Sequence, residues 1–427
     1  MRYRAFPVRG PGFYWDAAEL EARVAAAASA LAASLAPGGA HVAVARQDAD
    51  WVVEALAVWR LGGVLVPLHP DLPERERALV EEDLHGAREL PDGAAAVVWT
   101  SGTAGRPRGV ILGHDGLAYV GVASAQRLGL TARDVWALTL STAHVGGLAT
   151  LVRAAVVGHG LWVAGPFDAE GLDGAIEAGH ATFASLVPIM LERLLAARAG
   201  RPVASTLRGI LLGGAAAPRP LVERARAAGV PVFLTYGMTE ASSQVATAPP
   251  TLVEAKPGTV GTPLEGTEVR ISDEGEIEVR GPGLALGRLG GNARLPDEGG
   301  WFRTGDLGRI DHEGHLFVTG RASDRVISGG VNVDPLEVEG VLRRSASVQD
   351  VCVVGMPDPE WGERVVAVVQ WNAGREDREG LEAWARAQLR AAQRPRAWVT
   401  CTELPRNRSG KVDRAAAREL AGRALHP

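Results

Sequence analysis

One stretch of the chain combines hydroxyls, glycines and arginines. It runs from Thr100 to Gly109 as Thr-Ser-Gly-Thr-Ala-Gly-Arg-Pro-Arg-Gly, with an apolar run on either side. Glycines let backbone N–H groups point into one concavity, hydroxyls add donors, and arginines add the positive charge that suits phosphate oxygens. The GxxxxGK[ST] spacing of a Walker loop is absent. Taken alone, the stretch fits either a phosphate-binding loop or a turn between two strands.

A second stretch, Thr235 to Glu240, reads Thr-Tyr-Gly-Met-Thr-Glu and follows directly after an apolar run. Threonine and glutamate at the carboxyl end of a strand lie where open α/β sheets bind ligands. A carboxylate there could hold Mg²⁺, which takes one or two protein carboxylates and leaves its other positions to phosphate and water. Both residue types also suit an ordinary turn and helix start, so this reading stays open as well.

Two further sites fit contact with a nucleotide or ligand. Asp306, in Arg-Thr-Gly-Asp, could accept hydrogen bonds from a ribose diol, and it is equally unremarkable as a turn residue. The pair Gly329-Gly330 fits either a turn or a place where the backbone approaches a ligand closely.

Lysine is scarce in this chain. Only Lys256 and Lys411 occur among 45 basic residues, and Lys411 stands in Ser-Gly-Lys-Val-Asp-Arg near the end of the sequence. A compact ammonium on a mobile stem differs from a planar guanidinium, so lysine at position 411 indicates a site that needs an ammonium. Chance is the alternative, because two lysines must fall somewhere.

The patterning from residue 94 onward predicts the scaffold for these residues. Apolar runs of strand length alternate with helical windows such as Pro188–Ala197 and Arg219–Ala228. Such alternation predicts parallel βαβ units with both sheet faces covered. The expected strands are 95–99, 161–164, 182–187, 209–212 and 230–234.

After Pro257 the pattern changes to short β-type runs, expected at 268–271, 275–280 and 314–318, with a loop over 281–300. The last segment mixes strands at 351–354 and 365–369 with helices at 336–344 and 378–391. The expected fold class is therefore α/β. A large N-terminal domain of parallel βαβ sheets with a small β subdomain spans residues 1–322, and a small α+β domain spans residues 323–427.

Composition excludes several classes of protein. The chain has 427 residues, and its formal charge of −5 is unfavourable for nucleic-acid binding. Cys352 and Cys401 stand far apart, which excludes a disulfide framework and a structural zinc site. We find no signal peptide and no apolar segment long enough to span a membrane, so we expect a cytoplasmic protein without a membrane partner.

Taken in order, these motifs resemble those of the adenylate-forming superfamily of acyl-CoA ligases, luciferases and peptide-synthetase adenylation domains. The resemblance runs from about residue 94 to 415. It matches the family's phosphate loop, Thr-Glu motif, ribose-binding segment, interdomain hinge and catalytic-lysine segment, which here are Thr100–Gly109, Thr235–Glu240, Arg303–Asp306, Gly320–Gly330 and Arg408–Arg414.

This resemblance implies a reaction in two steps. A carboxylate attacks the α-phosphorus of ATP to give an acyl-adenylate and pyrophosphate, and the thiol of coenzyme A then displaces AMP. Both steps build negative charge, so positioning and electrostatic stabilisation should dominate catalysis. The family also implies Mg²⁺ as cofactor and a mobile C-terminal domain that rotates about a hinge near Ser323.

Residue roles follow from the same resemblance. Lys411 bridges the carboxylate and the α-phosphate, Thr239 contacts the α-phosphate, and Glu240 holds Mg²⁺. The residues expected around the rest of the nucleotide and at the pantetheine tunnel are Thr100, Ser101, Gly102, Thr103 and Arg108 at the β- and γ-phosphates, Asp306 and Arg321 at the ribose, Gly214, Ala215, Tyr236 and Gly237 at the adenine, and Gly329 and Gly330 at the tunnel.

Three residues depart from the family pattern. Arg108 stands where many relatives have lysine, and Ala104 replaces a common hydroxyl residue. Ser323 stands where many relatives carry a hinge aspartate, so the hinge is assigned by position only.

Within the superfamily, the chain looks most like the o-succinylbenzoate–CoA ligases of menaquinone synthesis. The similarity lies in 143–148, 211–218, 235–247 and 327–330. It implies that the acid binds in a site whose residues are His144, Arg153, Gly213, Ser243, Gln244 and Thr247. It also implies that His144 lies close to the reacting atoms.

Arg153 lies in an apolar stretch where an unpaired guanidinium is costly. It fits a bidentate clamp for the second carboxylate of o-succinylbenzoate, and the alternatives are snorkelling or a structural ion pair. His144 could equally be a hydrogen-bonded core histidine, and Trp361 could meet the CoA nucleotide or simply pack.

Two other functions stay open at this point. One is a CoA ligase for another aryl or short-chain acid, and the other is a non-catalytic nucleotide-binding relative. Homo-oligomer formation is also left open.

Overall fold

The computed structural model describes residues 3–86, 90–100, 108–290, 295–297, 299–407 and 410–425. The chain forms two compact units. Unit 1 comprises Met1–Gly214, Arg224–Val269 and Val279–Phe302, and unit 2 comprises Ala215–Glu223, Arg270–Glu278 and Arg303–Pro427. The domain boundary expected between residues 322 and 323 falls inside unit 2, and it stays a prediction.

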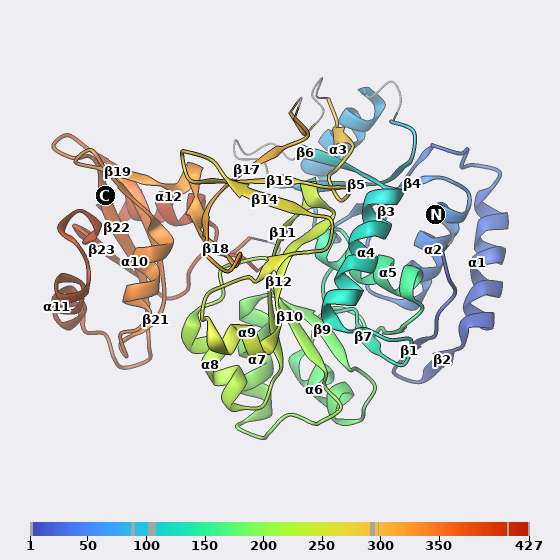
Figure 1. Ribbon diagram of the computed structural model, residues 1–427, viewed down its shortest axis with the longest axis horizontal. Helices are drawn as coiled ribbons and strands as arrows, with labels where there is room; N and C mark the ends of the chain where they lie inside the picture. The colour runs from blue at the N-terminus through green and yellow to red at the C-terminus, as the bar shows by residue number, and fades with distance from the viewer. Residues whose placement is uncertain are drawn as a thin grey trace. The chain divides into compact units, whose positions relative to one another are not determined.

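A nine-stranded sheet is the main element of unit 1 (Figure 1), with the order β13-β12-β11-β10-β9-β7-β8-β1-β2. Its central strands pair in parallel, as the alternating pattern predicts. In sheet order, the strands are Thr262–Pro263, Ser243–Ala248, Val232–Met238, Gly209–Leu212, Phe183–Leu186, Val135–Ala137, Gly160–Trp162, Val8–Gly10 and Phe13–Trp15.

Helices join these strands and begin where the local sequence favours a helix start. α6 (Ala169–Glu177) is capped by Asp168, which accepts the Gly171 N–H at 2.7 Å. α7 (Pro188–Arg198) has proline in its first turn, where the missing N–H costs nothing. The remaining helices around this sheet are α5 (Val145–Val157), α8 (Arg219–Ala227) and α9 (Pro250–Ala255).

A second sheet of unit 1 has five strands in the order β16-β6-β5-β4-β3. Their bounds are Gly287–Arg288, Arg108–Gly113, Ala94–Thr100, Val64–Leu68 and Ala40–Val44. On one face, Val66 packs with Val80 of α3 (Glu74–Gly86), and on the other, Leu65 joins the large core with Trp51 of α2 (Ala49–Arg60). Helices α1 (Ala17–Leu31) and α4 (His114–Leu128) also contribute to that core.

The β-type runs expected after residue 257 are strands of a four-stranded sheet. Its order is β14 (Glu268–Ile271), β15 (Glu276–Arg280), β17 (Phe302–Ile310) and β18 (Leu316–Arg321). β17 and β18 pair antiparallel, which brings Asp306 opposite Arg321.

The C-terminal part of unit 2 is the expected α+β fold, drawn in orange and red in Figure 1. β21 (Val348–Asp358) and β22 (Gly362–Trp371) form its centre, with β19 (Val326–Ser328), β20 (Val331–Val333) and β23 (Ala397–Cys401) beside them. Side chains of a strand alternate between its two faces. Accordingly Val351 and Val353 pack under α10 (Pro335–Leu342) and α11 (Arg378–Gln388), while Cys352 and Val354 pack under α12 (Arg414–Leu425).

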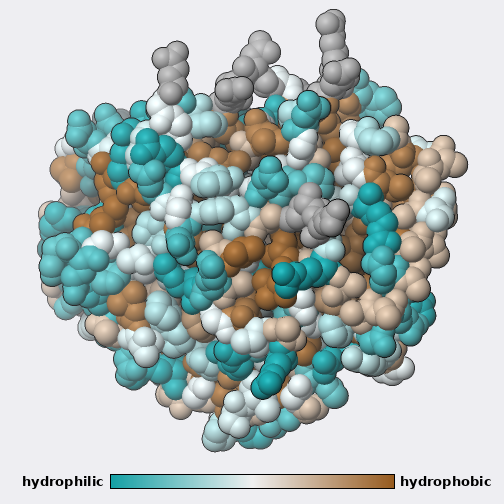
Figure 2. Space-filling view, turned by 45° about the vertical axis from the view of Figure 1, so that its right-hand side comes forward, coloured by the Kyte–Doolittle hydropathy of each residue, from teal (hydrophilic) through white to brown (hydrophobic). Residues whose placement is uncertain are grey.

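Two features add to the sequence-based expectation. β6 and β12 run antiparallel to β5 and β11, and the expected loop over 281–300 contains the short strand β16. The described part of the chain holds no helix that is both long and apolar enough to span a membrane. On the face in Figure 2, hydrophobic side chains lie in separate small patches between hydrophilic ones.

Candidate active site

The segments expected around an adenine follow two neighbouring strands of the nine-stranded sheet. Leu212, the last residue of β10, pairs with Leu234 of β11, so Gly213 and the residues after Leu234 lie at the same edge of the sheet. A Cβ at Gly213 would lie 2.5 Å from Cγ2 of Thr235, which shows how closely the two segments pack. Tyr236 is largely buried on β11. Gly214 has a positive φ of 78°, and the next residue, Ala215, belongs to unit 2.

Backbone constraints hold the Thr-Glu motif. Thr239 and Glu240 lie in a 3₁₀ turn, Thr239–Ala241, between β11 and β12. Ser242 and Ser243 after it have positive φ values of 53° and 111°, which are rare for residues with a side chain. A Cβ at Gly237 would lie 1.7 Å from the carbonyl oxygen of Ser243, so only glycine permits this approach. The sequence alone favours a turn and helix start here, and the structure has a 3₁₀ turn followed by an antiparallel strand.

The carboxylate of Glu240 forms an ion pair that the sequence analysis missed. Nη2 of Arg288 donates to Oε1 of Glu240 at 2.8 Å, and the Glu240 side chain is 17% exposed. The backbone of Glu240 is held as well, because its carbonyl accepts the Ala285 N–H at 2.8 Å. Position 288 carried no sequence signal, since the contact depends on β16 joining the second sheet.

The hydroxyl-rich stretch connects two antiparallel strands. Thr100 ends β5 and pairs with Arg108, the first residue of β6, whose side chain is exposed. Ser101, Gly102 and Thr103, with Ala104, lie outside the described residues. The structure therefore places the two ends of this stretch side by side, and the role of the stretch as a phosphate loop stays a prediction.

Three residues expected to bind the acid come together in one buried polar network. Arg153 of α5 donates from Nη1 to Oε1 of Gln244 at 3.1 Å, and Nε2 of Gln244 donates to Oγ1 of Thr247 at 2.7 Å. Two further members come from elements that sequence spacing does not connect. They are Ser124 on α4, which donates to Gln244 and lies 3.3 Å from Nη1 of Arg153, and Thr235 on β11, which lies 2.9 Å from Thr247.

Within the part of the chain that the structure describes, Arg153 is buried and has no acidic partner. Its side chain is 1% exposed and stacks over Trp136, with 4.2 Å between the guanidinium carbon and the ring centroid. Within the described ranges its polar partners are the neutral Ser124, Thr150 and Gln244, and its Nε has no hydrogen-bond partner. Burial lowers the pKa of Arg153 to about 9. Because the Arg153 side chain is buried, its guanidinium does not reach solvent, which excludes snorkelling. The described partners are neutral, so they do not form the structural ion pair that was the other alternative.

His144 stands beside a second histidine. It precedes α5 as the N-cap residue, and its ring lies 5.7 Å from that of His69, which follows β4. Both histidines belong to unit 1. No sequence pattern links His69 to His144, because the two positions are 75 residues apart in the chain.

Unit 2 brings together three residues expected to act on the nucleotide. Asp306 and Arg321 face each other across β17 and β18, with 3.4 Å between Oδ1 and Nε. Burial and the charge of Arg321 lower the pKa of Lys411, and the charge of Asp306 opposes that shift. Lys411 therefore lies within electrostatic range of both charged groups.

Two residues that the sequence analysis missed hold these groups in place. Glu276 accepts the Gly305 N–H at 2.7 Å and fixes the turn before Asp306. Asn407 accepts the Lys411 N–H at 3.1 Å, and the Asn407 N–H donates to the Lys411 carbonyl at 2.8 Å. In each case a side-chain oxygen accepts a backbone N–H, and no spacing rule in the sequence predicts such a contact.

The glycine pair forms a tight hairpin turn. Gly329 and Gly330 join β19 to β20 with φ values of 58° and 76°, which glycine adopts without strain. Trp361 packs against this turn, since a Cβ at Gly329 would lie 2.8 Å from its ring. The guanidinium of Arg396 covers the Trp361 ring at 3.6 Å.

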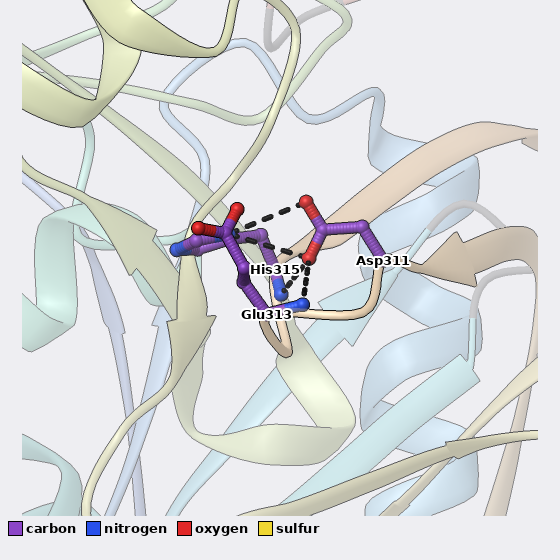
Figure 3. A group of neighbouring side chains, drawn as sticks. All are labelled: Asp311, Glu313 and His315. Carbon is purple, nitrogen blue, oxygen red and sulfur yellow. Dashed lines mark hydrogen bonds and ion pairs between the residues drawn. The ribbon is translucent and has the colours of Figure 1, made fainter.

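One further cluster of potential ligand atoms lies in unit 2. Asp311, Glu313 and His315 gather at the turn between β17 and β18 (Figure 3). Asp311 accepts the backbone N–H groups of Glu313 and His315 at 3.0 and 2.9 Å, which accounts for the cluster as the closure of a turn.

Comparison with known proteins gives two matches to protein families. Residues 80–289 match the AMP-binding enzyme family, and residues 337–411 match the AMP-binding enzyme C-terminal domain. In sequence, the chain is 37% identical over 345 residues to a 2-succinylbenzoate–CoA ligase of a Geobacillus species, covering 77% of this chain and 69% of that protein.

Solved structures agree with this result. The o-succinylbenzoate CoA synthetase of Bacillus subtilis, in complex with the acyl-adenylate intermediate, matches with a TM-score of 0.88 and 30% identity over 97% of this chain and 95% of that one. The same enzyme in complex with ATP and magnesium ion matches with a TM-score of 0.87 and 30% identity, covering 96% of each chain.

Proposed function

Because the chain belongs to the family of AMP-binding enzymes, we propose that it is the ATP-dependent ligase that joins 2-succinylbenzoate, also called o-succinylbenzoate, to coenzyme A. The carboxylate attacks the α-phosphorus of ATP, which releases pyrophosphate and leaves an acyl-adenylate. The thiol of coenzyme A then attacks the acyl carbon and releases AMP. We assign the reaction to menaquinone biosynthesis on the resemblance set out above.

We assign Asp306, Arg321 and Lys411, which all belong to unit 2, to the ribose and the α-phosphate of the nucleotide. Asp306 accepts the ribose hydroxyls, with Arg321 beside it. Lys411 bridges the attacking carboxylate and the α-phosphate. The lowered pKa of Lys411 has burial as its first cause, and an arriving polyanion reverses that effect by favouring the charged ammonium.

Thr239 and Glu240 form the part of the site at the end of β11. We assign Thr239 to the α-phosphate, Gly214, Ala215, Tyr236 and Gly237 to the adenine, and Gly213 to the acid. Glu240 fits a magnesium site, because it offers a partly exposed carboxylate at the carboxyl end of a strand and Mg²⁺ prefers oxygen ligands. Bound there, Mg²⁺ would neutralise charge on the phosphates.

The assignment of 2-succinylbenzoate as the acid rests on one observation: Arg153 is buried, and its described partners carry no negative charge. A buried guanidinium without a carboxylate partner is costly, and a carboxylate from the substrate would offset that cost. 2-Succinylbenzoate has two carboxylates, of which only one is activated. Arg153 binds the other, with Gln244, Ser243 and Thr247 as polar neighbours and His144 at the side of the acid.

Thioester formation uses the glycine hairpin. We place Gly329 and Gly330 at the path of the pantetheine arm, with rotation about a hinge near Ser323 at the boundary between residues 1–322 and 323–427. This assignment follows the family resemblance, and the positive φ values of the two glycines are compatible with close backbone approach to a ligand.

Acid-dependent ATP–pyrophosphate exchange tests the proposal. Wild-type enzyme should exchange rapidly with 2-succinylbenzoate and slowly with benzoate. Arg153→Leu should lower kcat/KM for 2-succinylbenzoate by about a hundredfold, the loss expected for hydrogen bonds to a charged group, and leave the benzoate rate nearly unchanged. Arg153→Lys keeps a charge and should retain part of the preference. Equal losses with both acids in Arg153→Leu would contradict a role for Arg153 in choosing the acid.

A further inference from the structure

The carboxylate of Glu240, which is expected to bind the metal, is paired with the guanidinium of an arginine. Among the described residues, Arg288 is the one side chain that donates to Glu240, with 2.8 Å between Nη2 and Oε1. Arg288 is 34% exposed and Glu240 is 17% exposed, so the pair is shielded from water more than a surface ion pair is.

The fold holds this pair from two directions. β16 places Arg288 opposite Val110 of β6, and Ala285, three residues earlier, donates its N–H to the Glu240 carbonyl. Both residues belong to unit 1. One short segment therefore fixes both the backbone and the carboxylate of Glu240.

The Arg288 side chain is not fully satisfied in this arrangement. Its Nε is buried and has no hydrogen-bond partner within the described ranges, and the guanidinium lies 6.0 Å from the ring centroid of Phe302. A guanidinium that donates to only one oxygen of a carboxylate lacks the bidentate geometry that makes such pairs strong. The ion pair between Arg288 and Glu240 is therefore weak enough for another cation to replace it.

A divalent cation and a guanidinium compete for the same carboxylate oxygen. Mg²⁺ binds carboxylate oxygens at about 2.1 Å, which leaves no room for Nη2 at hydrogen-bond distance without strong repulsion between the two cations. Repulsion between the two cations therefore makes metal binding at Glu240 compete with the Arg288 contact.

We propose that Arg288 is the counter-cation of Glu240 and competes with Mg²⁺ for it, so that this residue sets the magnesium concentration at which nucleotide binds. This inference rests on the proposed function, because it requires Glu240 to meet the metal. Arg288 acts on the metal through Glu240 and is a positioning residue. Without the metal, it keeps the carboxylate from repelling the phosphates of the nucleotide.

Calorimetric titration with α,β-methylene-ATP at a series of Mg²⁺ concentrations tests this competition without turnover. Arg288→Gln should lower the Mg²⁺ concentration for half-maximal nucleotide binding by about threefold, the range expected for loss of a partly exposed ion pair. It should also weaken binding of the analogue when Mg²⁺ is absent. Arg288→Met, which keeps the apolar stem, carries the same prediction if the glutamine variant does not fold, and Arg288→Lys should lie between.

Arg280→Gln is the matched control. Arg280 on β15 forms a bidentate pair with the exposed Glu268, at 3.0 and 2.6 Å, so its loss removes an arginine–glutamate pair that does not include Glu240. The Mg²⁺ requirement should not change in this variant.

A second variant separates failure of this inference from failure of the metal site. Glu240→Gln should raise the Mg²⁺ requirement if Glu240 meets the metal. No change in Glu240→Gln would overturn the metal role itself. A raised requirement in Glu240→Gln, with an unchanged or raised requirement in Arg288→Gln, would overturn only the competition.

Discussion

Arg153 and Arg198 are equally buried, each 1% exposed, and they differ in what surrounds them. Arg198 donates to Asp173 and lies 2.8 Å from Glu177, so carboxylates of unit 1 compensate its charge. Arg153 has hydroxyls, an amide and an indole ring around it. Among the described residues, Arg198 thus has acidic partners and Arg153 has none, which is the difference expected if Arg153 binds an anionic group of the substrate.

The titration of Arg153 gives a pH dependence with a defined sign. Burial lowers its pKa to about 9, so the free enzyme carries the charge below pH 9 and loses it as the pH rises through that value. Attraction for a second carboxylate should be lost over the same range. The ratio of kcat/KM for 2-succinylbenzoate to that for benzoate should therefore fall above about pH 9, since kcat/KM reports the groups of the free enzyme.

The titration of Lys411 should change kcat/KM for both acids by the same factor, so it cancels in the ratio of the two values. A ratio that stays constant between pH 7 and pH 10 would show that the charge of Arg153 plays no part in selecting the acid. Arg153→Leu should give a low, pH-independent ratio.

At this scale the sequence predicted part of the network. An arginine within apolar residues marked position 153 as unusual, and similarity marked Gln244 and Thr247. Ser124, Thr150 and Trp136 could not be predicted as its neighbours, because α4 and β7 reach Arg153 only through packing of the sheet.

Among the elements, the turn between β11 and β12 depends on one glycine. In Gly237→Ala the added methyl group would meet the Ser243 carbonyl, so the strands must separate. We expect a loss of about 3 kcal/mol in the free energy of unfolding, measured by urea denaturation, together with weaker ATP binding. Gly174→Ala, in α6 with no atom near the added Cβ, should stabilise the protein by about 0.5–1 kcal/mol. Equal stability of the two variants would contradict this account of the turn.

The segment that carries Lys411 is fixed at both ends by ion pairs. Arg406 pairs with Asp350 at 2.7 Å, and Arg414 pairs with Glu339 at 2.6 Å. Glu339 is 2% exposed, also lies 3.3 Å from Arg343 and accepts the Val353 N–H. Removing it leaves two arginines without this partner.

We therefore expect Glu339→Ala to lower the free energy of unfolding by about 3 kcal/mol and to slow adenylation. Glu382→Ala is the control, because Glu382 on α11 pairs with the exposed Arg378 and Arg386. Its effect on stability should stay below about 1 kcal/mol. A small effect of Glu339→Ala in urea denaturation would contradict the structural role of this network.

Elements with clear periodicity were predictable from the sequence. β10, α7 and α8 occur within a residue or two of their expected bounds. β12 was not predicted, since Ser242-Ser243-Gln244 after a Thr-Glu pair favours a helix start and only pairing with β11 makes a strand. β16 has two residues and exists through its pairing with β6.

For the whole molecule, the order of the motifs carried the most information. Five motifs in sequence identified the superfamily, and the comparisons confirmed it. The ion pair between Arg288 and Glu240 could not be predicted, because the two residues are 48 positions apart and no spacing rule relates residues that far apart in sequence. Which residues meet the nucleotide stays a prediction from the sequence, and the fold shows which contacts hold those residues in place.

The most direct test of the central claim is the initial rate of CoA-dependent AMP formation from ATP across a panel of acids. The panel should contain 2-succinylbenzoate, benzoate and a short fatty acid. We predict rapid AMP formation with 2-succinylbenzoate, formation of the matching CoA thioester in equal amount, and slow turnover of both monoacids. Rapid turnover of a monoacid with 2-succinylbenzoate inert, or no AMP from any acid, would contradict the account.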